Sequence, residues 1–166
     1  MMMEKNDKRL PFLLTLAVII ADQLSKWLIT VFIPVNEIGA SFFGGFLRII
    51  HARNNAIAFS IGTNLPDSFR MILFSAVPLV VLGAIVIYLL KTDNLTPLQR
   101  WSVCGIIGGG MGNLVDRIFR PSGVVDFIDV KFYGLFGLDR WPTFNVADAA
   151  IVICGFMLVI AFMKSK

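Results

Sequence analysis

The sequence predicts an all-α integral membrane protein in which four transmembrane helices carry a small extracytoplasmic β-sheet. Of its 166 residues, 57% are hydrophobic and only 16% are charged. Soluble domains contain about 45–50% hydrophobic and about 25% charged residues. The apolar residues form long blocks instead of alternating with polar ones. The length allows a single domain, residues 1–166. Its predicted spans are residues 10–33, 71–90, 101–119 and 144–163.

The first block, Leu10–Ile33, follows three cationic residues and has no small-x-small cleavage site, so we expect it to be retained as a transmembrane helix. At about 1.5 Å of rise per residue it can cross a hydrocarbon core about 30 Å thick. Asp22 and Lys26 lie four residues apart, on one face of this helix. Such a pair is either a buried structural ion pair or a contact for substrate.

Residues 34–70 form the first predicted outer loop. Glycines interrupt it, and Phe46–Ala58 contains short β-like runs, which favour a small sheet or hairpin outside the bilayer. Within these runs lies the segment Arg53-Asn54-Asn55. Adjacent amides are typical of a turn. The functional alternative is that Asn54 hydrogen-bonds the backbone of a peptide substrate.

The next two blocks are residues 71–90, which carry no charge, and residues 101–119. The polar connection between them contains Pro97, which suits the first turn of the following helix. The later block contains two overlapping G-x-x-x-G patterns, with glycines at 105 and 109 and at 108 and 112. Such patterns let a neighbouring helix approach closely. We therefore expect this helix to pack tightly against others.

Polar residues gather where the third block ends and the fourth begins. Asp116 and Arg117 follow Asn113 by three and four residues, so all three can approach one side of a helix. Asp148 is the only charge within residues 144–163. We expect Arg117 to hold its neighbour Asp116 as an anion.

Four spans place both termini on one side of the membrane, and the distribution of Lys and Arg favours the cytoplasm. The outer loops are then residues 34–70 and 120–143, with Tyr133 and Trp141 as interface aromatics. By this parity Asn54, Asp126 and Asp148 all lie at the outer boundary of the bilayer. Their common position is the reason to consider them as one site.

The composition excludes several other kinds of site. The net charge of +4 is spread in small groups, which favours membrane lipids over nucleic acid as a partner. His51 is the single histidine, and no His-Glu-x-x-His pattern occurs, so we expect no metal. Cys104 and Cys154 lie in apolar segments as small core residues. No Gly-x-Ser-x-Gly motif is present.

Asp126 and Asp148 remain as a candidate catalytic pair. Two close carboxylates resist double ionisation, so one can deprotonate water while the other, protonated, polarises a peptide carbonyl. The alternative is that the two aspartates are unrelated polar anchors. A proton-coupled transporter that uses Asp22 with Lys26 and Asp116 with Arg117 is a competing class, and a non-enzymatic scaffold is a third.

Five segments resemble the signature blocks of the bacterial lipoprotein signal peptidases, also called signal peptidase II or prolipoprotein signal peptidase. The resemblance covers nearly the whole chain, and the blocks occur in the order of that family. The segments are DQLSK at 22–26, ARNNAIAFS at 52–60, GGGMGNLVDR at 108–117, VVDF at 124–127 and FNVADAAI at 144–151.

The resemblance implies four transmembrane helices, a small outer β-structure and an aspartyl endopeptidase without metal or cofactor. It assigns catalysis to Asp126 and Asp148. It implies cleavage of prolipoprotein signal peptides just before a diacylglyceryl-modified cysteine, at the extracytoplasmic face of the bacterial cytoplasmic membrane. We expect a monomer. The supporting residues that it implies are Asp22, Lys26, Asn54, Asn113, Asp116, Arg117 and Asn145.

Overall fold

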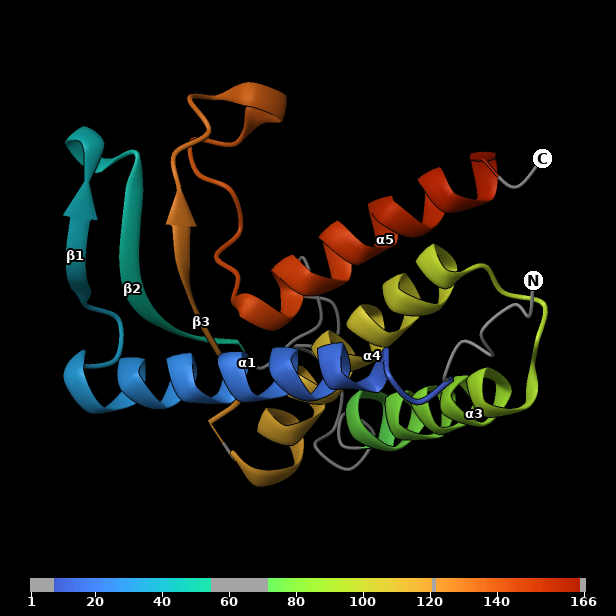
Figure 1. The fold of residues 1–166 in the computed structure, drawn as a ribbon. Coiled ribbons are helices and arrows are strands. Elements are labelled where there is room, and N and C mark those ends of the chain that lie inside the picture. The colour runs from blue at the N-terminus through green and yellow to red at the C-terminus, as the bar shows by residue number, and fades with distance from the viewer. Residues whose placement is uncertain (1–7, 55–71, 121, 165–166) are drawn as a thin grey trace.

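A computed structural model describes residues 8–54, 72–120 and 122–164. In these residues a helical bundle carries a small antiparallel sheet at one end (Figure 1). The prediction of a helical protein with a small sheet is thus confirmed. The long helices are α1 (Phe12–Phe32), α3 (Val77–Lys91), α4 (Pro97–Phe119) and α5 (Val146–Lys164), and the strands are β1 (Ile38–Phe42), β2 (Leu47–Asn54) and β3 (Val124–Val130). Short turns of helix are η1 (Phe43–Gly45), η3 (Ile72–Ala76) and η4 (Leu135–Gly137).

Within the described residues, three helical segments are long and apolar enough to cross a membrane, namely Phe12–Phe32, Leu73–Lys91 and Val146–Lys164. They match three of the four predicted spans. The remaining span, residues 101–119, lies within α4, which is not in this group. Its crossing of the membrane therefore stays a prediction.

The position of α4 explains why it is less apolar than the other helices. It packs against α1, α3 and α5 and buries many of its residues, so it faces protein where the others expose apolar side chains. Pro97 lies in its first turn, as predicted. Ahead of it, Thr96 and Gln99 form a capping box that satisfies free N–H groups at the helix start.

The two glycine patterns of α4 face two different helices. A Cβ at Gly105 or Gly109 would collide with α5, at Cys154 and at the carbonyl oxygen of Ala147 respectively. A Cβ at Gly108 would come within 3.0 Å of the Thr15 carbonyl oxygen of α1. At Gly112 it would lie 2.6 Å from an Asp22 carboxylate oxygen, also on α1. The predicted close packing is confirmed, and it holds α1 and α5 against adjacent faces of one helix.

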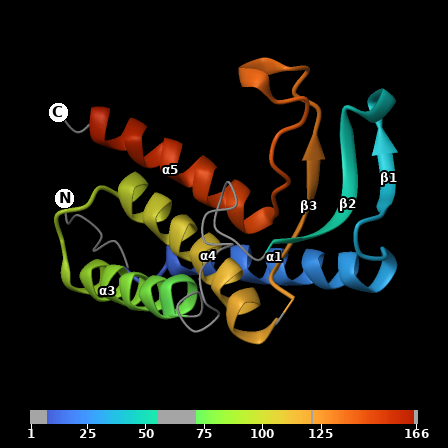
Figure 2. The same cartoon turned by 180° about the vertical axis from the view of Figure 1, so that it is seen from behind.

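The sheet has the order β1-β2-β3, and its strands run across the direction of α1 (Figures 1 and 2). The sequence analysis does not predict β3; it places Asp126 only at the outer boundary of the bilayer. The strand is buried on both faces along most of its length, so its sequence lacks the polar alternation of a half-exposed strand. Val125 and Phe127 pack with Ile29 of α1, which attaches the sheet to the bundle.

Candidate active site

Asp126 lies in β3 and is only 3% exposed. Antiparallel pairing with β2 brings Asn54, the last residue of that strand, beside it. The Asn54 Nδ2 donates to Asp126 Oδ2 at 2.9 Å, and the Asn145 Nδ2 donates to Oδ1 at 2.7 Å. The interpretation of Asn54 as a turn residue is therefore wrong, because it ends a strand and binds a carboxylate.

Asp148 lies in the first turn of α5, and its geometry follows from the start of the helix. Asn145 directly precedes the helix and accepts the Asp148 N–H through Oδ1 at 3.0 Å. In return Asp148 Oδ2 accepts the Asn145 N–H at 3.2 Å, which completes a capping box. The other oxygen of Asp148 accepts from Asn113 Nδ2 at 2.7 Å. A helix N-terminus favours the negative charge of this carboxylate.

Asn145 joins the two aspartates. Its fully buried side chain binds Asp126 through Nδ2, and its backbone N–H binds Asp148. The same Nδ2 lies 3.0 Å from Asn113 Oδ1 and 3.4 Å from the Val125 carbonyl oxygen. Residues from β2, β3, α4 and α5 thus converge on one small polar cluster. The predicted meeting of Asn54, Asn113 and Asn145 with both aspartates is present in the structure.

The two carboxyl groups have different surroundings. The pKa of Asp126 is raised to about 6, mainly by burial and also by the negative charge of Asp148, while hydrogen bonds from Asn54 and Asn145 act in the opposite direction. Asp148 is only partly buried. Asp126 therefore retains a proton at a pH where an ordinary aspartate has lost it.

A layer of buried charges lies behind this pair. Lys26 and Asp22 are fully buried and form the predicted ion pair at 2.8 Å. Lys26 Nζ also lies 3.1 Å from Asp116 Oδ2 and donates to Asn113 Oδ1 at 3.0 Å. Because Lys26 occupies the oxygen of Asn113, the amide nitrogen is the atom turned toward Asp148. The ammonium group thereby fixes the orientation of that amide.

Asp22 and Asp116 each anchor backbone next to one of the central aspartates. Asp22 Oδ1 accepts the N–H of Ala147, the neighbour of Asp148, at 3.0 Å. Asp116 Oδ2 accepts the N–H of Val125, the neighbour of Asp126, at 3.1 Å. One ion cluster therefore positions the start of α5 and the start of β3 at the same time.

The expected partnership of Asp116 with Arg117 needs correction. Within the described residues, the cations at ion-pair distance from Asp116 are Lys26, from another helix, and Arg120 at 3.3 Å. Of the carboxylates around it, Arg117 interacts electrostatically most strongly with Asp148, and then with Asp126. Arg117 thus belongs to the candidate site, and Lys26 and Arg120 balance Asp116.

The sequence analysis missed Gln23. Its Nε2 lies 3.1 Å from Asp22 Oδ2, 3.1 Å from Asp116 Oδ1 and 3.0 Å from the Gly112 carbonyl oxygen. The available signal was a polar amide next to Asp22 in an otherwise apolar block. Its contacts connect α1 with α4 behind the two central aspartates.

Comparison with known proteins agrees with this arrangement. The model of the family described as Signal peptidase (SPase) II matches residues 14–164. The chain belongs to the signal peptidase II family. The matched range includes every residue of the polar cluster and every charged residue behind it. The candidate site therefore lies within the part of the chain that the family shares.

Individual members of this family are similar to the chain over most of its length. It is 46% identical over 162 residues to the lipoprotein signal peptidase of Treponema pallidum (strain Nichols), covering 98% of the chain and 87% of that relative. It is 48% identical over 154 residues to the lipoprotein signal peptidase of Treponema denticola, with coverage of 93% and 88%.

A solved structure is also similar to the chain in its three-dimensional fold. A bacterial membrane enzyme determined by the in meso method at 2.3 Å resolution superposes with a TM-score of 0.82 and 28% identity, covering 99% of this chain and 93% of the other. Family membership and several apolar helices together make this a multi-pass bacterial membrane protein.

Proposed function

We propose that this protein removes the signal peptides of prolipoproteins, with Asp126 and Asp148 as an aspartyl catalytic pair. Its substrates are diacylglyceryl-modified prolipoproteins, which it cuts just before the lipidated cysteine. The observation that carries the proposal is the link through Asn145, which holds Asp126 Oδ1 at 2.7 Å and Asp148 Oδ2 at 3.2 Å. The names of its relatives support the same substrate class.

The two environments suit two different roles. Asp148 is partly exposed and lies at a helix N-terminus, so it is the ionised group and takes a proton from the attacking water. Asp126, whose pKa burial raises to about 6, is the protonated group and donates a hydrogen bond to the scissile carbonyl.

The water oxygen bonds to the carbonyl carbon while Asp126 transfers its proton to the carbonyl oxygen, which gives a tetrahedral diol. The proton that Asp148 accepted then passes to the leaving nitrogen as the C–N bond breaks, and a diol hydroxyl returns a proton to Asp126 as the new carboxyl group forms. The reaction consumes one water and needs neither metal nor cofactor.

The other predicted residues position this pair. Asn54 and Asn145 hold Asp126, and Asn113 holds Asp148. Asp22, Lys26 and Asp116 form the ion cluster behind them, which orients Asn113 and the backbone beside each aspartate. Arg117 adds positive charge near Asp148.

The same proposal includes the arrangement in the membrane. Residues 1–166 form one domain with four spans, at about 10–33, 71–90, 101–119 and 144–163, and both termini are cytoplasmic. The outer loops, residues 34–70 and 120–143, place the site at the extracytoplasmic face. The sheet lies beside the end of α1 and the start of α5 (Figure 1). This topology requires both of these helix ends to be on the outer side of the membrane. The protein acts as a monomer.

The decisive experiment incubates the purified protein in detergent micelles with a prolipoprotein that carries the diacylglyceryl cysteine. Cleavage is read as a mobility shift, with a chelator present throughout. We expect cleavage by the wild type and by Asp139→Asn, an exposed aspartate in the outer loop, and none by Asp126→Asn. Loss of activity with chelator and rescue by zinc would overturn the aspartyl mechanism. Proton transport without cleavage would instead indicate the transporter class.

A further inference from the structure

The second outer loop presents a cluster of aromatic side chains at the end of the sheet. We call residues 132–137 the aromatic turn. Tyr133 is 70% exposed and Phe136 is 84% exposed. Large aromatic side chains that are exposed to water are unfavourable. When several of them form a group, the surface usually contacts another molecule or a membrane. The proposed function does not use this turn.

The backbone of the turn directs these rings outward. Tyr133 has a φ of 54° and Phe136 a φ of 55°. Residues other than glycine rarely adopt such values, so the conformation requires support from elsewhere. Gly134 and Gly137 also have positive φ, at 79° each, and no residue of η4 is buried. The Phe136 ring lies 6.3 Å from that of Phe132, and Tyr133 stacks on Phe46 at 6.4 Å between ring centroids. These contacts leave Tyr133 and Phe136 largely exposed, and an apolar environment around the rings would cover them.

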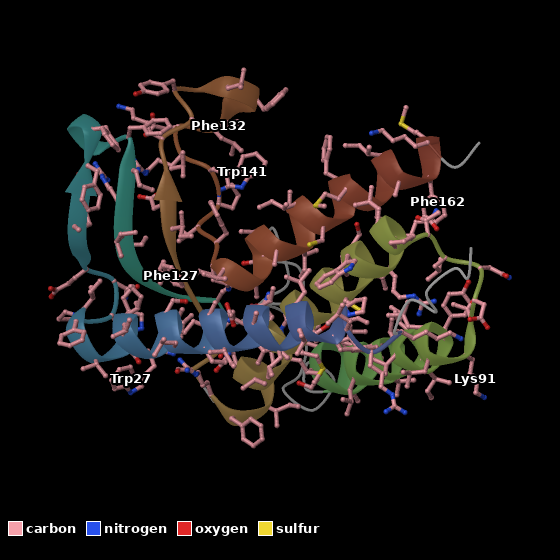
Figure 3. All side chains as sticks on the ribbon, in the orientation of Figure 1. Trp27, Lys91, Phe127, Phe132, Trp141 and Phe162 are labelled. Carbon is pink, nitrogen blue, oxygen red and sulfur yellow. The ribbon has the colours of Figure 1, made fainter. Side chains whose placement is uncertain are left out.

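The base of the turn is firmly held, so the exposed rings belong to an ordered platform. Phe132 packs on Trp141 with ring centroids 5.0 Å apart, beside the end of β3 (Figure 3). Arg140 Nε lies 2.6 and 2.7 Å from the two carboxylate oxygens of Asp129. The same guanidinium also donates to the Gly45 carbonyl oxygen of the neighbouring hairpin at 3.2 Å.

The turn lies on the side of the sheet that faces α5. In both views η4 leans from the end of β3 toward that helix (Figures 1 and 2). Helix α5 is apolar enough to cross a membrane and exposes Val152 and Phe156. The turn and the lipid-facing surface of α5 therefore lie beside the same region of bilayer.

Charge around the turn fits the surface of a bilayer. Lys131 Nζ lies 5.2 Å from the centroid of the Tyr133 ring, so a cation accompanies the exposed aromatic. Tyr and Trp favour the depth of lipid head groups, where one end of the ring is apolar and the other is hydrated. Lysine at that depth meets the phosphates of anionic lipids.

We propose that the aromatic turn inserts into the head-group region of the leaflet in which α5 begins, and that Phe136 is its deepest side chain. This contact fixes the depth of β3, the strand that carries Asp126, relative to the helix that carries Asp148. The inference depends on the membrane location of α5 and is independent of the catalytic assignment.

Fluorescence quenching tests the insertion. Trp27, Trp101 and Trp141 are replaced by Phe, and Phe136→Trp supplies the single fluorophore. The protein is reconstituted in vesicles of phosphatidylcholine and phosphatidylglycerol that contain lipid brominated either near the head group or near the end of the acyl chain. The matched control is Ile38→Trp in the same background, because Ile38 is 55% exposed and lies at the other end of the sheet, on the strand farthest from α5.

We expect strong quenching at position 136, greater with bromine near the head group than at the chain end, and little quenching at position 38. Equal quenching at both positions, or none at 136, overturns the proposal. Emission at 136 that changes with the amount of protein per vesicle and not with bromine would indicate contact with a second copy, and also overturns it.

A second measurement leaves the native fluorophore in place. With Trp27 and Trp101 replaced, Trp141 reports directly on the base of the turn. The exposed substitution Phe136→Asp should leave thermal unfolding nearly unchanged and lower the quenching of Trp141 by the lipid brominated near its head group. Unchanged quenching of Trp141 contradicts the assignment of Phe136 as the inserted side chain.

Discussion

The two halves of the site hold the same chemical group in different ways. In the sheet half, Asp126 is buried in a strand, and side-chain amides supply the hydrogen bonds to its oxygens. In the helix half, Asp148 is partly exposed and belongs to the capping box that starts α5. The sheet half has a carboxyl whose pKa burial raises to about 6, and the helix half has a carboxylate that a helix N-terminus favours.

With the proposed roles, the fold itself divides an acid and a base between two identical side chains. A shared proton between close carboxylates is expected from repulsion alone, but repulsion does not decide which group holds it. Burial in the strand and exposure at the helix start supply that decision. Variants of the sheet half and of the helix half should therefore differ in their effects on cleavage, stability and pH dependence.

The largest effects should follow from Asp126→Asn and Asp148→Asn. Each variant should lose cleavage by about 10²–10⁴-fold, because each removes one partner of a proton exchange. Their stabilities should differ in sign. At neutral pH Asp126→Asn removes a buried carboxylate and should raise the thermal unfolding temperature, while Asp148→Asn weakens a cap worth about 1 kcal/mol and should lower it. Cleavage assays and unfolding scans in detergent test both statements, and equal shifts in stability would contradict the comparison.

The next largest effect should come from Asn145→Ala, which removes the link between the halves. Hydrogen bonds to charged groups contribute about 1.5–3 kcal/mol, so we expect a loss of about 10–100-fold in kcat. Asn54→Ala changes only the sheet half and should cost less. A greater loss in Asn54→Ala than in Asn145→Ala would show that the two halves are not coupled through Asn145.

The pH dependence of cleavage should distinguish the two halves of the site. Activity requires protonated Asp126, so it should fall as pH rises through about 6. Asn54→Ala removes a hydrogen bond that lowers the pKa of Asp126, so this limb should move to higher pH while the acidic limb stays in place. Profiles measured with chelator for wild type and Asn54→Ala decide this. A basic limb that does not move would mean that Asp126 is not the protonated group.

The same shift has a consequence for stability. The pKa of Asp126 in the folded protein lies above the ordinary aspartate value of 3.8, so the folded state binds this proton more tightly than the unfolded state. The resulting stabilisation is fully present below about pH 4 and is lost as pH rises through about 6. The unfolding temperature of the wild type, relative to that of Asp126→Asn, should therefore fall across this interval. A constant difference between the two proteins would contradict the raised pKa.

The smallest effect should come from Gln23→Leu, because Gln23 acts behind both halves through Asp22 and Asp116. Hydrogen bonds to charged groups contribute about 1.5–3 kcal/mol, but Gln23 contacts neither central aspartate, so only part of that energy affects the rate and kcat should fall by about 2–10-fold. KM and both pH limbs should stay unchanged. Full rate in Gln23→Leu would mean that Lys26 alone holds the ion cluster, and a shifted limb would place Gln23 closer to the chemistry than the structure does.

Local geometry made some of this site predictable. The spacing of Asp22 and Lys26 on one helix face determines their distance almost without reference to the rest of the chain. The overlapping glycine patterns likewise predicted close helix packing. The resemblance to a family added Asn145, whose bridging position no spacing rule would reveal.

Other features depend on how separate elements pack, and sequence reasoning could not supply them. The pairing of Lys26 with Asp116 exists only because Gly112 lets α1 and α4 approach closely. Strand β3 went unrecognised because burial on both faces gives it an apolar sequence like the end of a membrane helix. The three contacts of Gln23 also join two helices, so its role became visible only in the structure.

The capping box at the start of α5 links the chemical step to local motion. When Asp148 takes up a proton, its attraction to the helix N-terminus disappears, and its hydrogen bond from the Asn145 N–H weakens. The first turn of α5 therefore loosens at the stage of the cycle when the peptide has just been attacked. It tightens again once the proton has passed to the leaving nitrogen. In the proposed mechanism the start of α5 is therefore loosest while the tetrahedral intermediate exists, and firm again when the products form.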